Sequence, residues 1–546
     1  MSIGNDAFDY IVVGAGSAGA ALAARLSEDP AVSVLLLEAG GPDDKQEIFV
    51  PAAFSKLFKS DADWDYQTTP QGQLEGRTVY WPRGKVLGGS SSLNAMMWVR
   101  GFAADYDGWA ELAGDQWSYQ ALLPYFRKVE AVEGTSDPDQ GMDGAIAISH
   151  QRSPRSHTAT FLAAAAEVGL PTVSPNSANP LGASQTMVSQ RGGMRFSTAA
   201  GYLAPAAERA NLTVRTDAQA TRVLFEATRA IGVEYVTGGT VASASARREV
   251  VLSGGAVNTP QLLMLSGIGD AGHLREHGIE VLVDAPEVGA NMRDHLFAAL
   301  VVETEDDTLF AAETEAQLND FVTNQNGMLT SNVAEAYGFV TTDPALAHPD
   351  IEVLFAAVPY IGEGLVPAPR HGVSVGAILL QPKSRGTVRL ASADPLAKPV
   401  IDPNYLGDPE GADRTTILAG LRVCEQILGA RAFAPTRGDG VFIQPAGSDA
   451  ASIAERDAIL LDEYAQTLYH PTSTARMGSD AASVVDPDLR VRGVQGLRVA
   501  DASVMPEIIR GHTNAPSIVI GEKAADLLRA AAELGEKAAR PLNALP

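Results

Sequence analysis

Short apolar runs separated by turns and by Ala-rich segments open the chain. An apolar run at 8–13 is followed by a glycine-rich turn at 14–19, an Ala- and Leu-rich segment at 20–26 and a second apolar run at 34–37. Buried parallel strands have short, continuous apolar sequences, and helices packed on a sheet are rich in Ala and Leu. The pattern therefore predicts a strand, a turn, a helix and a strand in succession, which is the beginning of an α/β domain.

Further apolar runs in the middle and at the end of the chain predict more strands and helices. Clusters of β-branched and aromatic residues indicate strands, whereas apolar residues three or four positions apart indicate helices. We predict strands at 212–214, 222–225, 232–236, 249–252 and 497–501, and helices at 118–130, 259–265 and 517–532. The Rossmann-like beginning and the strand–helix end indicate one cofactor domain assembled from both ends of the chain.

The segment 306–382 has long mixed stretches with few repeated signals, and we interpret it as part of a second, inserted domain. We expect a mixed α/β fold of two domains. The cofactor domain is predicted to comprise 1–155, 200–305 and 465–546, and the substrate domain 156–199 and 306–464. The tail at 533–546 is expected to be peripheral or poorly ordered.

Composition and charge exclude several classes of function. The chain has 66 acidic and 41 basic residues, a net charge of −25, and such a surface repels nucleic acids and anionic membranes. No apolar run is long enough to span a membrane, and the N-terminus lacks the pattern of a secretory signal, so we expect a cytoplasmic protein. The single cysteine, Cys424, excludes an intrachain disulfide, and we expect it to be a buried structural thiol.

The turn after the first predicted strand carries the spacing of a dinucleotide-binding fingerprint. Gly14 permits the tight turn, Gly16 lets the backbone approach a pyrophosphate, and Gly19 lets the helix pack on the strand. The anion is then expected at the start of the helix, beside Ser17 and Ala18. Glu38 ends the second strand, where a carboxylate can accept hydrogen bonds from an adenosine ribose; this argues against NADP.

Longer motifs follow the fingerprint in a fixed order. They occupy 81–96, 253–269, 288–295, 469–471 and 511–516, and together they resemble the signatures of the glucose–methanol–choline (GMC) oxidoreductases. The resemblance covers nearly the whole chain, and it is strongest to the branch of choline-dehydrogenase-like enzymes and bacterial primary-alcohol dehydrogenases. It implies a Rossmann-like FAD-binding domain with an inserted substrate domain built on an antiparallel sheet.

The resemblance also implies which residues contact FAD. Glycines allow backbone to lie against a flat ring system, because a Cβ would hold it away. Besides the fingerprint residues and Glu38, the expected contacts are Gly88, Gly89, Ser90, Asn94, Ala95, Met96, Val223, Asp501, Ala502, Asn514 and Pro516. Some relatives attach flavin covalently to a histidine at the position of Leu93; leucine has no nucleophile, so we expect FAD to be bound non-covalently.

Two of the nine histidines fit the chemistry of alcohol oxidation. Hydride transfer from an alcohol needs a base within hydrogen-bond reach of the hydroxyl, and imidazole meets this need. By resemblance His470 is the base and His512 its hydrogen-bonding partner. His295 is expected to hold a loop near the cofactor. His273 and His277 lie four residues apart but have no apparent third ligand, so no metal site is predicted.

The substrate is left open within the class of alcohols. The leading hypothesis is a primary aliphatic or aromatic alcohol oxidised to the aldehyde, with oxygen or another electron acceptor regenerating the flavin. Choline is the alternative, with Glu335 as the acid that would face its cation. A flavin-dependent lyase or a fatty-acid photodecarboxylase on the same scaffold is the alternative from another class. Candidate pocket residues are Met96, Trp64, Tyr337 and Phe339.

Overall fold

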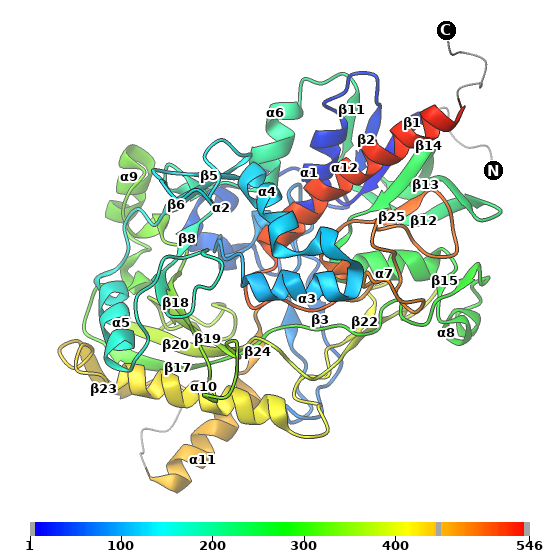
Figure 1. The fold of residues 1–546 in the computed structure, drawn as a ribbon. Helices are drawn as coiled ribbons and strands as arrows, with labels where there is room; N and C mark the ends of the chain where they lie inside the picture. Colours follow the sequence, from blue (N-terminus) through cyan, green and yellow to red (C-terminus); the bar gives the residue numbers. More distant parts are fainter. Residues whose placement is uncertain (1–5, 444–448, 540–546) are drawn as a thin grey trace.

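Two seven-stranded sheets organise the chain in the computed structural model, which describes residues 6–443 and 449–539. One sheet gathers strands from the beginning, middle and end of the sequence, and the other is built from the middle (Figure 1). The mixed α/β fold with an antiparallel second sheet is confirmed. The parts of the predicted domains and tail that fall on 1–5, 444–448 and 540–546 lie outside the described residues.

The first sheet has the strand order β11-β2-β1-β14-β13-β12, with β25 beside β14. Its strands are β1 (Ala7–Val13), β2 (Val34–Leu37), β11 (Leu212–Arg215), β12 (Ala218–Glu226), β13 (Arg229–Thr237), β14 (Thr240–Leu252) and β25 (Leu497–Val499). The pairs β1–β2, β2–β11, β1–β14 and β14–β25 are parallel, and β12 and β13 add an antiparallel edge. Pairing of β25 with β14 places the C-terminal strand in the sheet that begins at the N-terminus, as predicted.

Helices α1 (Ser17–Leu26) and α12 (Asn514–Ala539) pack side by side on this sheet (Figure 1). Their approach is close, because a Cβ added at Gly521 would lie 2.3 Å from the carbonyl oxygen of Ala18. Helix α12 continues beyond 532, where the sequence predicted its end, to Ala539, and Glu533 and Leu534 are exposed in this extension, consistent with a peripheral tail. The added residues are mostly Ala, Glu, Lys and Leu, which have high helix propensity.

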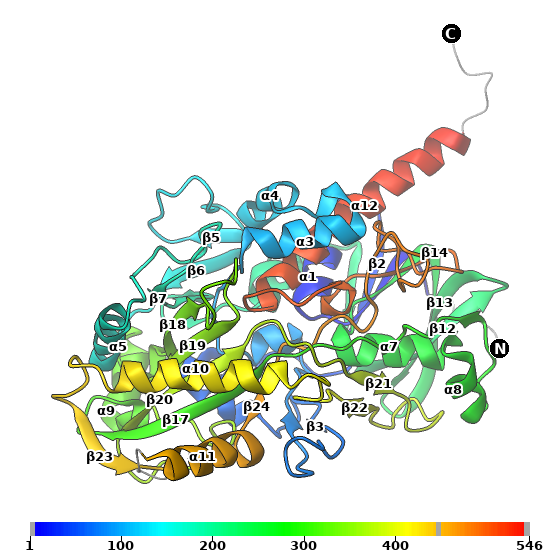
Figure 2. The same ribbon diagram turned by 60° about the horizontal axis from the view of Figure 1, so that its bottom comes forward.

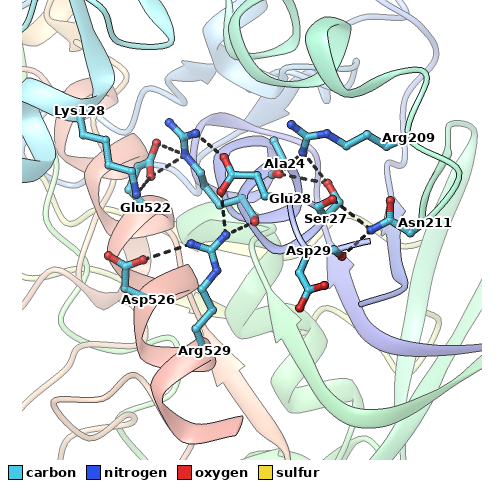
Figure 3. Close-up of polar contacts among 11 residues, drawn as sticks. Ala24, Ser27, Glu28, Asp29, Lys128, Arg209, Asn211, Glu522, Asp526 and Arg529 are labelled. Carbon is cyan, nitrogen blue, oxygen red and sulfur yellow. Dashed lines mark hydrogen bonds and ion pairs between the residues drawn. The ribbon is translucent and has the colours of Figure 1, made fainter. Parts of the chain in front are cut away.

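A buried carboxylate joins these two helices. Glu522 of α12 has no exposed surface, and it accepts hydrogen bonds from Arg25 at 2.9 Å and from the hydroxyl of Tyr202 at 2.7 Å. Lys128 forms an ion pair with it at 2.8 Å, and Figure 3 shows Lys128 and Glu522 together with Glu28 and other residues of the contact. The carboxylate therefore has two positive charges and one hydroxyl donor around it, and a buried charge requires such pairing.

The second sheet has the order β23-β17-β20-β19-β18-β7, with β24 beside β17, and all its pairs are antiparallel. Its strands are β7 (Ala183–Gln185), β17 (Leu296–Thr304), β18 (Ala334–Val340), β19 (Ile351–Ala356), β20 (Gly372–Leu379), β23 (Arg437–Val441) and β24 (Gln466–Thr467). Helix α10 (Ala412–Leu428) crosses one face of this sheet (Figure 2). It carries Cys424, which is buried in the core, and burial raises the pKa of the thiol.

The predicted domain boundaries at 305 and 465 do not follow the sheets. β17 and β24 fall in the predicted cofactor domain, yet both pair within the second sheet. β17 is almost entirely buried, because its apolar run lies between β20 and β23 in the interior of that sheet. The chain therefore crosses to the second sheet directly after His295 and returns after β24.

The remaining helices and strands connect and cover the two sheets. The helices are α2 (Gln46–Phe49), α3 (Ala103–Ala113), α4 (Tyr119–Val129), α5 (Ser156–Glu167), α6 (Ala204–Ala206), α7 (Gly255–Leu265), α8 (Ala271–Glu276), α9 (Glu315–Asn324) and α11 (Ala450–Ala458). The short strands are β3 (Tyr66–Gln67), β4 (Tyr80–Trp81), β5 (Glu130–Val132), β6 (Ile146–His150), β8 (Met187–Val188), β9 (Gln190–Arg191), β10 (Met194–Arg195), β15 (Ile268–Gly269), β16 (Val283–Asp284), β21 (Thr387–Arg389) and β22 (Val400–Asp402). No helix among the described residues has the length and apolar character needed to cross a bilayer.

Glu522→Ala is expected to lower the free energy of unfolding by about 2 kcal/mol, because it leaves Arg25 and Lys128 without their buried counter-charge. Urea unfolding followed by tryptophan fluorescence measures the change. Glu28→Ala is the control: Glu28 also pairs with Arg25 but is 38% exposed, so its loss should cost less than about 1 kcal/mol. Equal losses in the two variants would contradict the role given to Glu522.

Candidate active site

A deep cavity lies between the two sheets. On one side it is lined by residues at the carboxyl ends of the parallel strands β1, β2 and β14, among them Val13, Leu37 and Leu252. On the other side, Phe297 of β17 and Leu354 of β19 belong to the antiparallel sheet. In open α/β sheets, ligands bind in the crevice outside the carboxyl ends of the strands. The cavity therefore places a ligand-binding edge opposite a mostly apolar wall.

The glycines of the fingerprint bring backbone segments into direct contact. Gly14 has a φ of +98°, and a Cβ there would lie 2.4 Å from the carbonyl oxygen of Ser253. A Cβ at Gly19 would lie 1.9 Å from the carbonyl oxygen of Gly14, and one at Gly89 would lie 2.7 Å from the Cα of Gly16. The structure thus shows the feature predicted for each glycine. Gly14 makes a tight turn, Gly19 allows the helix to pack closely, and Gly16 leaves the backbone surface open.

The start of α1 faces this cavity. Gly14, Gly16, Ser17 and Ala18 line it, and the helix has no side chain that caps its first N–H groups. Uncapped N–H groups at a helix start attract anions. The hydroxyl of Ser17 donates to Oδ1 of Asn514, at the start of α12, so two helix starts meet at this edge.

Glu38 lies at the end of β2 and lines the same cavity. Its carboxylate accepts hydrogen bonds from the N–H groups of Ala15 and Gly40, both at 2.9 Å. Burial raises the pKa of Glu38 to about 7, although these backbone donors lower it. The carboxylate is thereby fixed beside the fingerprint turn, as the sequence predicts.

The other predicted cofactor residues divide into two groups. Gly89, Ser90, Asn94, Ala95, Met96, Asp501, Ala502 and Asn514 line the cavity together with the fingerprint. Gly19, Gly88, Val223 and Pro516 do not line it. Gly88 has a φ of +87° and shapes the turn before Gly89, whereas Val223 is in the core and the neighbouring Ala218–Ala220 line the cavity instead.

His470 and His512 lie side by side in the lining of the cavity, but the hydrogen bonds of their rings among the described residues go to His295 and Glu352 and not to each other. Their ring centroids are 4.7 Å apart with an interplanar angle of 64°, and both residues line the cavity. They come from two loops after the second sheet, in motifs separated by β25. Burial lowers the pKa of His470 well below its usual value, and the neighbouring His512, His295 and Arg83 lower it further.

Hydrogen bonds behind His470 determine which of its nitrogens carries a proton. Burial lowers the pKa of His295 to about 3, so this ring is neutral. Its Nε2 is 3.1 Å from the carbonyl oxygen of Leu380 and must donate, which leaves Nδ1 as an acceptor. Nδ1 of His470, 3.0 Å from that acceptor, must therefore donate. Nε2 of His470 is left with a free lone pair, which is what a base at this position requires.

Three functional neighbours of the histidines were missed by sequence reasoning. Asp294 accepts hydrogen bonds from the N–H of His470 at 2.8 Å and from the hydroxyl of Thr467 at 2.6 Å, and so fixes the loop that carries His470. His295, expected only to hold a loop, contacts the ring of His470 directly. The signal for both was the motif at 288–295, which contains them side by side.

Glu352 is the third, and no motif in the sequence contains it. It lies on β19 with no exposed surface, and its carboxylate oxygens are 3.1 and 3.3 Å from Nε2 of His512. Its position resembles that of the carboxylates that orient a catalytic imidazole from behind. Sequence spacing gave no indication of this contact, because it joins positions 352 and 512 through the packing of a loop on the second sheet.

The predicted substrate residues are only partly brought together. Met96 and Trp64 line the cavity, whereas Tyr337 and Phe339 pack in a core cluster with Phe102 behind it. Trp64 stacks on Tyr66 with centroids 5.7 Å apart, and the ammonium of Lys85 lies 4.8 Å from its ring centroid. The Trp64 ring thus already has an aromatic and a cationic neighbour.

Glu335 also lies outside the cavity lining. Its carboxylate is fully buried and accepts hydrogen bonds from the hydroxyls of Ser331 and Thr158 and from the N–H of Arg155. Burial raises its pKa, and these donors lower it. Of the pair considered for metal binding, His273 accepts a hydrogen bond from the N–H of Leu390 at 3.0 Å through Nε2.

Comparison with known sequences gives a consistent result. Two family models described as GMC oxidoreductase match residues 8–297 and 382–521. An uncharacterized GMC-type oxidoreductase of Mycobacterium tuberculosis is 57% identical, covering 95% of this chain and 99% of that protein. An alcohol dehydrogenase [acceptor] of Pseudomonas putida is 40% identical, with 95% of each chain covered. Human mitochondrial choline dehydrogenase is 41% identical, covering 97% of this chain and 91% of its own.

Solved structures agree with the sequence comparison. Pyridoxine 4-oxidase from Mesorbium loti superposes with a TM-score of 0.86 at 31% identity, over 95% of this chain and 98% of that one. A formate oxidase variant of Aspergillus oryzae, studied for FAD modification, superposes with a TM-score of 0.89 at 30% identity, over 97% and 99%.

Glu335→Gln is expected to lower the free energy of unfolding by about 1–3 kcal/mol, because one of its buried donors loses an acceptor. The KM for choline relative to that for an uncharged alcohol is expected to stay the same, since Glu335 does not line the cavity. Urea unfolding and steady-state kinetics measure the two quantities. A selective rise in the KM for choline would instead support a contact between Glu335 and a cationic substrate.

Proposed function

Because this chain belongs to the GMC oxidoreductase family, we propose that it oxidises a primary alcohol to the aldehyde with non-covalently bound FAD as hydride acceptor. The observation that carries the proposal is the unprotonated Nε2 of His470 beside His512, in the cavity that also holds the dinucleotide fingerprint. The proposed base, a second polar side chain and the proposed cofactor-binding edge then line the same cavity.

The residues of the cavity fit FAD. The start of α1 offers uncapped N–H groups to a pyrophosphate, and Glu38 offers a carboxylate to a ribose. The hydroxyl of Ser253 is buried without a partner among the described residues and belongs to the lining, as expected for a group that binds a polar ligand. Leu93, also in the lining, supports non-covalent attachment.

The side chains of the site can carry out the proton part of the reaction. Bound FAD supplies the acceptor for the hydride. His470 Nε2 takes the hydroxyl proton of the alcohol, while the carbon–hydrogen bond breaks with its electron pair leaving as hydride, and the carbon–oxygen double bond forms. His512 holds the substrate oxygen and orients the bond that breaks. The apolar wall excludes water and so keeps the His470 lone pair available.

The lining of the cavity favours an uncharged alcohol. Among the described residues, the carboxylates that line it are Glu38 and Asp501, both on the side of the first sheet. The opposite wall is formed largely by apolar side chains, among them Phe54, Phe58, Phe297, Leu354 and Leu468. A trimethylammonium group would have aromatic neighbours there but no lining carboxylate. We therefore place primary aliphatic and aromatic alcohols before choline.

The first experiment is anaerobic stopped-flow absorbance of the FAD-loaded protein, in the dark, with hexanol, benzyl alcohol, choline and glucose. Bleaching of the oxidised-flavin band is expected to be fastest with hexanol or benzyl alcohol. Admission of air then separates the acceptors: rapid recovery indicates oxygen, and slow recovery indicates another acceptor. A spectrum that no alcohol changes would refute the proposed function and bring forward a lyase or a fatty-acid photodecarboxylase.

His470→Gln is expected to slow flavin bleaching by the best alcohol by about 10²–10⁴-fold, because it removes the base while keeping a polar side chain of similar size. The flavin content of the variant should equal that of the wild type. His150→Gln, at an exposed position at the end of β6, is the matched control and should keep the wild-type rate. If the His470 variant bleached its flavin at the wild-type rate, His470 would not be the base.

The pH dependence of bleaching should reflect the lowered pKa of His470. A base with a lowered pKa stays unprotonated as the pH falls through the ordinary histidine range, near 6.5. The rate is therefore expected to be constant from about pH 8 to about pH 6 and to fall only in more acidic solution. A decline centred near pH 6.5 would show that burial and the facing groups, His512, His295 and Arg83, do not depress the pKa of His470.

A further inference from the structure

Arg195 is a buried guanidinium without a counter-charge. It ends β10, in the hairpin that β9 and β10 form, and it is 3% exposed. Two other buried arginines have carboxylate partners, since Arg100 pairs with Glu130 and Arg498 pairs with Glu249 at 2.8 Å. Arg195 forms no ion pair with a carboxylate among the described residues. Because buried charges are normally paired, the charge of Arg195 needs an explanation of its own.

Three hydrogen bonds hold this guanidinium in place. Its Nε donates to the carbonyl oxygen of Ile48 at 2.8 Å. Its Nη1 donates to the carbonyl oxygen of Ser91 at 3.1 Å and to Oδ1 of Asn94 at 2.8 Å. Its Nη2 is buried with no acceptor among the described residues. The acceptors are two carbonyl groups and an amide, so they fix the group without neutralising its charge.

The charge of Arg195 is kept at neutral pH. Burial lowers the pKa of Arg195 to about 9, and no charged neighbour contributes to this shift. Since the lowered pKa is still above neutral pH, the guanidinium stays protonated there. The hairpin therefore carries a permanent positive charge in the interior of the protein.

Asn94 connects this charge to the cavity. Oδ1 of Asn94 accepts two hydrogen bonds, one from Arg195 and one from the N–H of Met96 at 3.0 Å. The amide oxygen is thus turned toward these two donors, and the amide N–H₂ is left to donate elsewhere. Asn94 lies in the cavity lining. Arg195 consequently determines which end of this amide is available to a ligand.

The segment from Gly89 to Met97, which carries Asn94, extends along the cavity. At its start, Gly89 contacts the backbone of Gly16 in the dinucleotide fingerprint. At its end, Met97 lines the cavity and belongs to the apolar cluster against which Leu468 packs, two residues before the proposed base. The segment therefore joins the proposed pyrophosphate position to the proposed position of hydride transfer. The flavin half of the cofactor is expected along it.

We propose that Arg195 is a positioning residue that raises the reduction potential of bound FAD, through its fixed positive charge and through the N–H donor that it orients on Asn94. The inference rests on the proposed function, because it requires FAD in this cavity. A hydride carries a proton and an electron pair, so the flavin gains a negative charge while the alcohol becomes the aldehyde and its hydroxyl proton passes to His470. A positive charge and a donor that are already in place stabilise that negative charge and favour the transfer.

The midpoint potential of the FAD-loaded protein tests the proposal. It is measured by slow anaerobic reduction beside a reference dye, in the absence of any alcohol. Arg195→Met removes the charge and the donors, and it is expected to lower the midpoint potential by about 30 mV, a tenfold change in the equilibrium constant of a two-electron couple. Arg195→Lys keeps the charge and should retain most of the wild-type potential. A wild-type potential in Arg195→Met would overturn the proposal, as would an equal fall in Arg195→Lys.

Arg191→Met is the matched control. Arg191 lies on the same hairpin but is exposed, with its guanidinium 3.9 Å from the ring centroid of Phe196. Water and salt screen an exposed charge, so its loss should leave the midpoint potential unchanged. If Arg191→Met lowered the potential as much as Arg195→Met does, the effect would belong to the net charge of the protein, and the proposal would be wrong.

Further outcomes separate this inference from the proposed function and from misfolding. If no alcohol bleaches the wild-type flavin, alcohol oxidation fails as the function, while the potentials still decide the role of Arg195. If Arg195→Met does not fold or does not retain FAD, Arg195→Gln decides, because its amide keeps a donor and removes the charge. A lowered potential in Arg195→Gln supports the proposal, and a wild-type potential there contradicts it.

Discussion

Close contact between backbone segments at the start of α1 is the constraint on which the rest of the structure depends. Gly16 meets Gly89 there, Gly19 meets Gly14, and Ala18 meets Gly521 of the last helix. At each contact a Cβ would collide with main-chain atoms. The glycines therefore hold three remote parts of the chain around one point, and the cavity with its anion-attracting helix start opens beside it.

The two sheets contribute different surfaces to this cavity. The parallel strands of the first sheet have their carboxyl ends at one edge, and the turns that follow them carry polar groups and carboxylates. The antiparallel sheet presents apolar side chains to the same cavity and carries α10 on another face. The histidines reach the cavity on loops that follow the second sheet and the last parallel strand. The polar edge can thus bind a cofactor, while the apolar wall limits the access of water to the reacting atoms.

The rings of His470 and His512 have different hydrogen-bond partners on the side away from the cavity. A neutral ring, His295, fixes the proton of His470 on the side away from the cavity, whereas a carboxylate, Glu352, faces His512. Asp294 accepts a hydrogen bond from the main-chain N–H of His470 and so ties this residue to the loop before β17. Two chemically identical side chains in the cavity lining therefore have different hydrogen-bond partners, and these partners do not line the cavity.

The sequence by itself determined the local features. The apolar runs and the glycine spacing predicted β1, the turn before α1 and a second strand ending before Glu38, because each depends on residues near one another in the chain. The family resemblance singled out His470 and His512, and both line the cavity. Tertiary structure alone decided the rest. It placed β17 in the second sheet, turned Tyr337, Phe339 and Glu335 away from the cavity, and brought Glu352 to His512 and His295 to His470. These contacts join side chains more than 150 positions apart through packing, and no local pattern of hydrophobic and polar residues specifies such a pairing.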